Sequence, residues 1–132
     1  MKQKNESIVE PVSDDLEDLF DVSPILSKFD DDMEFYCELA EIFLHDAPQQ
    51  LDSLEKSLRK KDAEGVEKHA HKLKGASGNF GLERLYELFS ELQRSGSERK
   101  FDEASRIFSE VTSEYKQVEL ALKKSIKDIA QN

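Results

Sequence analysis

The stretch at residues 62–81, DAEGVEKHAHKLKGASGNFG, contains one amphipathic helix with its start and stop signals. Asp62 is a typical N-cap residue, because its carboxylate can accept a hydrogen bond from a free backbone N–H of the first turn. Apolar or small residues then recur every three or four positions, at Ala63, Val66, Ala70, Leu73, Ser77 and Phe80. The turn Asn79-Phe80-Gly81 ends the helix. This pattern predicts a helix with one face in a core and the other in solvent.

The solvent face of this predicted helix carries a histidine and two glycines. Because a helix advances about 100° per residue, His71 lies about 130° from the core direction, with Gly75 and Gly78 beside it. Lys74 lies at the edge of the face. Each glycine costs about 1 kcal/mol relative to alanine, so we interpret Gly75 and Gly78 as a flat surface that another protein's backbone can approach. The alternative is a surface histidine near glycines that serve helix packing.

On the N-terminal side, residues 31–61 show the same helical period. Asp31 and Glu34 form a variant of the capping box at its start. Pro48 interrupts the pattern, so we expect a kink or a restart of the helix near Asp46-Ala47. A short helix over residues 14–20 is expected before it, and Pro24 marks the boundary between the two.

On the C-terminal side, residues 82–95 and 101–129 each carry a stripe of apolar residues at helical spacing. No segment alternates strictly between apolar and polar residues, and no hairpin turn signal is present. Four amphipathic helices with short links predict an all-α fold, an antiparallel up-down four-helix bundle with a short additional N-terminal helix.

The length of 132 residues fits one domain with a tail. Residues 1–13 are polar and aperiodic, so we expect a flexible tail followed by a helical domain over residues 14–132. A net charge of -10 argues against nucleic acid and against an anionic membrane surface. Cys37 is the only cysteine, which excludes an internal disulfide and a thiolate metal cluster. With no long apolar run and no signal peptide pattern, a cytoplasmic location is expected.

The string His71-Lys72-Leu73-Lys74-Gly75, followed by Gly78 and Phe80-Gly81-Leu82, resembles histidine-containing phosphotransfer (HPt) domains of two-component phosphorelays. The resemblance covers roughly residues 30–130 and includes the Phe43-x-x-x-Ala47-Pro48 segment. It implies a domain that accepts a phosphoryl group from a receiver-domain aspartate and passes it to, or back from, another response-regulator receiver. Such a domain is a phosphohistidine carrier without ATP-dependent kinase activity of its own.

The resemblance also implies roles for individual residues. His71 would accept the phosphoryl group on Nε2, Lys74 would neutralise the phosphoryl oxygens, and Gly75 would keep access open. Gln93 on the next helix would hydrogen-bond the imidazole or the phosphoryl group, with Arg94 as the alternative.

The partners implied are response-regulator receiver domains and a sensor or hybrid histidine kinase. Docking would use the small surface of Gly75 and Gly78, with exposed parts of Leu82 and Tyr86, although both of these also fit ordinary packing positions. The resemblance implies a monomer without a cofactor of its own, and a divalent ion, Mg²⁺, supplied by the receiver. We find no nucleotide-binding loop in the sequence.

Three other functions stay open from the sequence alone. The chain could be a non-catalytic helical interaction module in which His71 is incidental. It could be the phosphotransfer module of a chemotaxis-type histidine kinase, phosphorylated from ATP by a separate kinase domain. A metal-binding bundle built on His45, His69 and carboxylates has the least support, because a zinc site needs three or four well-placed ligands and none can be assembled nearby.

Overall fold

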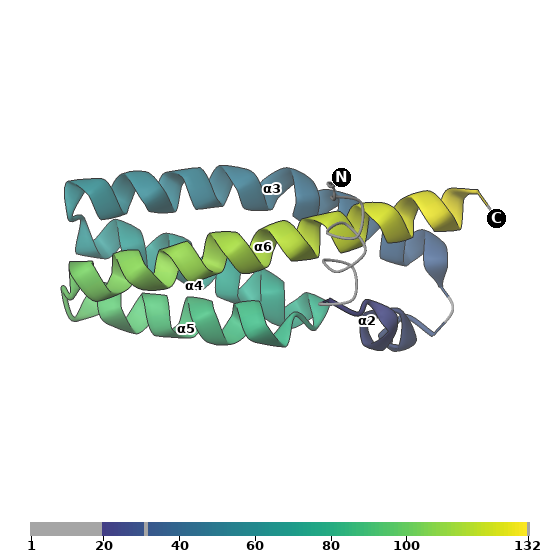
Figure 1. Cartoon of the computed structure of the whole chain (residues 1–132), viewed down its shortest axis with the longest axis horizontal. Helices are drawn as coiled ribbons and strands as arrows, with labels where there is room; N and C mark the ends of the chain where they lie inside the picture. Colours follow the sequence, from purple (N-terminus) through teal and green to yellow (C-terminus); the bar gives the residue numbers. More distant parts are fainter. Residues whose placement is uncertain (1–19, 31, 132) are drawn as a thin grey trace, which may run out of the picture.

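The computed structural model describes residues 20–30 and 32–131, and over these residues the regular structure is helical. Four long helices lie side by side, and a short helix lies at one end (Figure 1). They are α3 (Met33–Lys60), α4 (Ala63–Phe80), α5 (Glu83–Ser97), α6 (Phe101–Ala130) and the short α2 (Ser23–Lys28). Each long helix packs on the next, and α6 packs on α3, which closes the bundle. The predicted all-α four-helix bundle is confirmed.

The three links between the long helices use the same tight turn. In each, one residue adopts a left-handed conformation, with φ of 54° at Lys61, 83° at Gly81 and 60° at Arg99. The next backbone N–H then donates to a carbonyl five residues back, from Asp62 to Ser57, from Leu82 to Ser77 and from Lys100 to Ser95. This arrangement satisfies carbonyls that a helix end leaves free. Because the links are so short, consecutive helices are antiparallel neighbours.

Aspartates cap the first turns of α3 and α4. The Asp62 carboxylate accepts from the Gly65 N–H at 3.1 Å, as predicted. The carboxylate of Asp32 accepts from the Phe35 N–H at 3.1 Å. Our capping assignment for α3 was therefore one residue too early, and Asp31 itself lies outside the described residues.

Pro48 lies within α3, which continues past it to Lys60. Of the kink or restart that we expected near Asp46-Ala47, the restart does not occur. A proline inside a helix costs about 3 kcal/mol because it removes a backbone donor and crowds the preceding turn. Phe43 and Ala47 before the proline and Leu54 after it are all buried. The packing of both halves against the same core offsets the local cost.

The sequence analysis did not predict the short helix α2. Pro24 occupies its first turn, where a missing N–H costs nothing, instead of marking a boundary. Most of the helix predicted over residues 14–20, and the tail predicted over residues 1–13, lie outside the described residues.

Helix α2 covers the end of the bundle where α4 and α5 stop short of α3 and α6 (Figure 1). Ile25 is buried there. The ring of Phe29, just after α2, packs 5.4 Å from that of Tyr36 and 5.9 Å from that of Phe80. These edge contacts tie the C-terminal end of α4 to α3.

Gly96→Ala is expected to lower the free energy of unfolding by about 1–2 kcal/mol, the usual cost of overfilling a packed core. A Cβ at this buried position would lie 2.5 Å from Val66 Cγ1, and Val66 is fully buried in α4. Urea unfolding measures the change. Gly75→Ala is the matched control: a Cβ there meets nothing within 4 Å, so alanine should stabilise α4 by up to about 1 kcal/mol. Equal stabilisation by both variants would contradict the tight α4–α5 contact.

Tyr115→Phe is expected to flatten the loss of stability at alkaline pH. The buried Tyr115 hydroxyl has no hydrogen-bond partner among the described residues, and burial raises its pKa to about 12. An unfolded tyrosine titrates near about pH 10. The folded state therefore keeps this proton to a higher pH than the unfolded state does. The contribution of Tyr115 to the free energy of unfolding is complete below about pH 10 and is lost as the pH rises towards 12.

At neutral pH the Tyr115→Phe variant should lie within about 1 kcal/mol of the wild type, because no hydrogen bond is removed. Unfolding in urea at about pH 8 and at about pH 10.5 separates the two effects. Burial also raises the pKa of Tyr36, so the Tyr115→Phe variant should still lose stability at alkaline pH, but less than the wild type does. If the variant and the wild type lose the same stability between these two pH values, Tyr115 ionises without opening the core.

Candidate functional site

His71 lies in the second half of α4, on the face turned away from the core. Ala70 is fully buried and Leu73 is 3% exposed, whereas His71 and Gly75 are both exposed. The periodicity therefore gave the correct orientation of the helix. The imidazole is accessible to a large partner because no part of the described core covers it.

Gln93 on α5 lies against the imidazole. Its amide nitrogen is 3.4 Å from His71 Nδ1. Leu85, Phe89 and Leu92 are buried on α5 and hold this helix against α4, which turns the half-buried Gln93 towards His71. Arg94 is exposed and makes no such contact. The His71 side chain is exposed, and no described side chain hydrogen-bonds its Nε2.

The two glycines of the exposed face have different surroundings. A Cβ added to Gly75 would meet nothing within 4 Å, so the space beside His71 is open. A Cβ added to Gly78 would lie 3.0 Å from Cδ1 of Tyr86 on α5. Gly75 therefore leaves a gap at the surface, whereas Gly78 makes room for a neighbouring ring.

Lys74 directly precedes Gly75, and its ammonium lies 5.7 Å from the centroid of the Tyr86 ring. Tyr86 is 42% exposed and borders the His71 face, but Leu82 is only 2% exposed. Our expectation that Leu82 contributes an exposed docking surface is wrong. Its side chain belongs to the buried core, because the turn after Gly81 directs it inwards.

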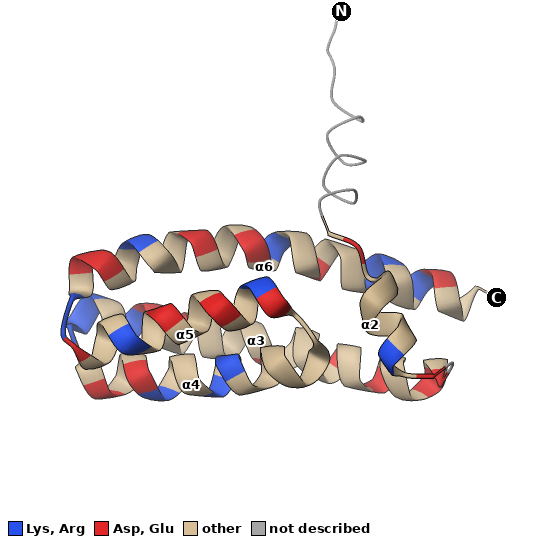
Figure 2. Ribbon diagram, turned by 90° about the horizontal axis from the view of Figure 1, so that it is seen from below, with Lys and Arg blue, Asp and Glu red and all other residues tan. Residues whose placement is uncertain are grey.

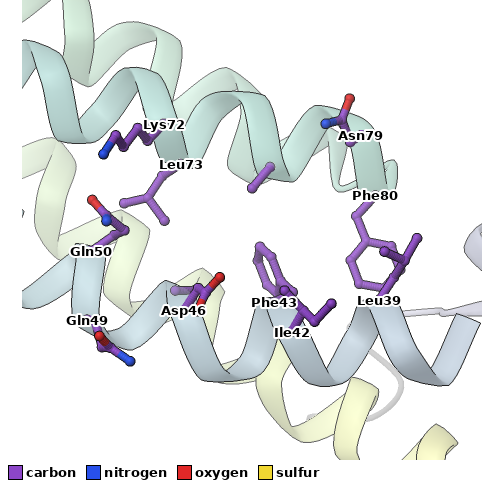
Figure 3. A pocket seen from close by; sticks show the side chains of 12 residues that line it. Leu39, Ile42, Phe43, Asp46, Gln49, Gln50, Lys72, Leu73, Asn79 and Phe80 are labelled. Carbon is purple, nitrogen blue, oxygen red and sulfur yellow. The ribbon is translucent and has the colours of Figure 1, made fainter.

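A groove that the sequence did not predict runs along the other side of α4, between α3 and α4 (Figure 3). It has a volume of about 400 Å³ and is largely apolar. Leu39 and Ile42 line its α3 wall and are 36% and 56% exposed. Lys72 and Ala76 line its α4 wall. Lys72, which follows His71 directly in the chain, lies on the wall of this groove.

A signal for this groove is present in the sequence. Residues 33–43 carry eight apolar residues, Cys37 included, which is more than one helix face can bury. Tyr36, Ala40 and Phe43 are buried, and Phe35, Leu39 and Ile42 remain exposed on the flank. A contiguous exposed apolar strip of this kind is typical of interaction sites.

The remaining histidines lie apart from this site. His69 Nδ1 donates to Gln50 Oε1 at 2.9 Å, and burial, with help from Lys68 and Lys72, lowers the pKa of His69. His45 contacts Gln49 on its own helix. Within residues 20–30 and 32–131, no three metal-ligating side chains of His, Cys, Asp or Glu lie together.

The surface around the site differs from the rest of the bundle in charge. Acidic and basic residues are interspersed along α6 (Figure 2), whereas residues 75–82 carry no charge. Lys74 is thus the last charged residue of α4.

None of the described helices is long and apolar enough to span a bilayer.

Comparison with known proteins agrees with this geometry. The family model described as the Hpt domain matches residues 38–131, which include α4, α5, α6 and most of α3. Neither the curated proteins nor the solved structures gave a match. Because the family model covers more than half of the chain, the protein belongs to the Hpt domain family, whose members take part in histidine phosphotransfer in two-component signalling.

Proposed function

We propose that His71 accepts a phosphoryl group from an aspartate of a receiver domain and passes it to, or back from, another response-regulator receiver. The observation that carries the proposal is the exposed imidazole, with Nδ1 against Gln93, Nε2 without a hydrogen bond to any described side chain, and open space at Gly75. A nucleophile that serves a large partner needs this access, and histidine forms covalent phosphoryl intermediates.

The proposed step is a displacement at phosphorus. The lone pair of Nε2 attacks the aspartyl phosphate, the Nε2–P bond forms, and the bond from phosphorus to the aspartate oxygen breaks. The aspartate leaves as a carboxylate. For Nε2 to hold a free lone pair, the ring proton must be on Nδ1.

Gln93 suits this requirement after a half-turn of its amide. The amide oxygen would then face Nδ1 and accept its proton, which fixes the tautomer with a free Nε2. The oxygen and nitrogen of a glutamine side chain exchange places by such a turn without moving the helix. Gln93 would therefore orient the ring during attack and hold the Nδ1–H of the phosphorylated imidazole.

Lys74 would supply positive charge to the phosphoryl oxygens. It follows His71 by three residues, and residues three apart on a helix are neighbours on its surface. Phosphoryl transfer requires chiefly positioning and charge neutralisation. We propose that the remaining charge comes from a divalent ion, Mg²⁺, held by the receiver, and that this chain has no cofactor and no ATP-dependent kinase activity of its own.

The receiver would dock over the exposed face of α4, with Gly75 beneath the contact and Gly78 and Tyr86 at one edge. The apolar strip of Leu39 and Ile42 extends this surface on the other side. We propose that the chain acts as a monomer in the cytoplasm, where one copy presents the whole surface to receivers and to the sensor or hybrid kinase that contains or supplies them.

A transfer assay tests the proposal. The protein is incubated with a receiver labelled on its aspartate, with ATP alone, and with an isolated histidine-kinase core plus ATP. Label is expected from the receiver and not from ATP alone. An adaptor would bind the receiver without gaining label, and the module of a chemotaxis-type kinase would gain label from the kinase core only. Either result would overturn the proposal.

A further inference from the structure

The N-terminal half of α3 is both apolar and acidic on its exposed side. It carries an apolar strip of three exposed residues, which are Phe35, Leu39 and Ile42. Between Lys28 and Lys56 the sequence contains nine aspartates and glutamates and no lysine or arginine. The apolar strip therefore lies in a region of the chain whose formal charges are all negative.

Two of these acidic residues border the apolar strip directly. Residues three or four positions apart are neighbours on a helix, so Glu38 lies beside Phe35 and Ile42. Asp46 follows Ile42 by four residues and lines the α3–α4 groove. Both acidic residues are exposed, and no described lysine or arginine forms an ion pair with either. Their charges are thus available to a partner.

The surface between His71 and the groove is open. Gly75 follows His71 by four residues, and a Cβ at Gly75 would meet nothing within 4 Å. Gly75 also has Lys72 three residues before it and Asn79 four residues after it, and both of these line the groove. A typical interface covers about 800 Å² on each partner, which is roughly 28 Å across. Since packed helices lie only about 8–10 Å apart, a receiver centred on His71 would cover the near side of α3 as well.

The charges around the groove favour one kind of partner surface. Lys72 is the one cation among the residues that line the groove, and it lies on the α4 wall, opposite the apolar strip (Figure 3). A partner with acidic side chains beside the strip would bring like charges together, whereas lysines or arginines there would pair with Glu38 and Asp46. A second copy of this chain is disfavoured for the same reason, because a two-fold contact would place two acidic borders against each other.

We propose that this side of α3 selects among receivers, and that it accepts those whose contact surface combines apolar side chains with lysine or arginine. The proposal rests on the function proposed above. It assigns Glu38 and Asp46 a role in recognition and none in the chemistry at His71. Exposed charges at the edge of an interface act mainly on the rate of association and on the choice of partner. Salt screens such charges, so their effect should decline as salt is added.

The test reverses both charges in a Glu38→Lys/Asp46→Lys variant. Single-turnover transfer is measured at increasing concentrations of a phosphorylated receiver that labels the wild type. At low salt and low receiver concentration, the variant should transfer about tenfold more slowly, since two exposed pairs are replaced by repulsion. At saturating receiver its rate should equal that of the wild type, because the surroundings of His71 are unchanged. In about 0.5 M salt the difference should fall to about twofold.

Glu103→Lys/Glu114→Lys is the matched control, because it makes the same change in net charge. Both residues lie on α6, which packs on α3 and α5. This control should transfer at the wild-type rate, and circular dichroism checks that both double variants fold. An equal loss in the two double variants would show that net charge alone slows association, which would overturn the proposal. Unchanged transfer in the Glu38→Lys/Asp46→Lys variant would overturn it too.

A second measurement does not depend on transfer. Two synthetic helical peptides share one leucine stripe, which is flanked by lysines in the first peptide and by glutamates in the second. In nuclear magnetic resonance titrations, the lysine peptide should shift the backbone amide signals of Leu39, Ile42 and Ala76, and the glutamate peptide should not. Equal shifts with both peptides, or shifts with neither, would contradict the proposal.

These outcomes are distinct from a failure of the proposed function. If the wild type takes no label from a receiver, the function fails, while the peptide titrations still decide which chemistry the apolar strip binds. Sedimentation velocity tests the remaining occupant. A wild-type dimer that Ile42→Ser separates would place a second copy on the strip, and the proposal would be wrong.

Discussion

His71→Gln is expected to abolish phosphoryl transfer to this chain and to leave the bundle folded. The lone pair of a glutamine amide nitrogen is delocalised into its carbonyl, so the variant has no nucleophile at this position. The side chain is exposed, and glutamine is a better helix former than histidine. We therefore expect the free energy of unfolding to change by no more than about 0.5 kcal/mol.

His69→Gln is the matched control, since it makes the same exchange two residues away on the same helix. His69 faces Gln50 on α3 and not the open surface, so this variant should still accept label. The P–N bond of a phosphohistidine is stable in alkali and hydrolysed by acid. The label on the wild type should therefore resist alkali and be released by acid. Undiminished labelling of His71→Gln would refute the assignment of the acceptor, whatever the label's stability.

The positions of the four long helices could be predicted because their signals are local. Asp62 and Gly81 bound α4 through side-chain and backbone contacts within a few residues of themselves. Pro48 shows the limit of such reasoning. Its local cost is real, but the buried residues on both sides of it decide that α3 continues. That balance depends on packing between helices, which a pattern along one helix does not contain.

The candidate site was predictable to the same degree. The exposure of His71 follows from the period of α4 alone. The contact between Gln93 and His71 depends on the register of two helices, and only the resemblance to a family suggested it before the structure was known. Leu82 and Tyr86 both fitted a docking surface by sequence, yet the turn at Gly81 buries the first and exposes the second.

Replacing Gly75 with a large side chain is expected to block transfer without harming the fold. A helical side chain covers the surface over the turn before its own Cα, so a leucine at position 75 would extend over His71. Nothing lies within 4 Å of the Cβ position, so the helix itself accepts the change. A partner phosphate held off by even about 1 Å can lose about 100-fold in rate, and we expect a loss of at least that size.

Ser105→Leu is the matched control for Gly75→Leu. It also introduces a leucine at an exposed small residue, but on α6, which packs on α3 and α5. Transfer from a phosphorylated receiver should stay at the wild-type rate in this control and fall sharply in Gly75→Leu. Urea unfolding should show Gly75→Leu to be at least as stable as the wild type, because a glycine leaves the helix interior. A stable Gly75→Leu protein with undiminished transfer would mean that the receiver does not approach His71 across this face, and the open space at Gly75 would then need another explanation.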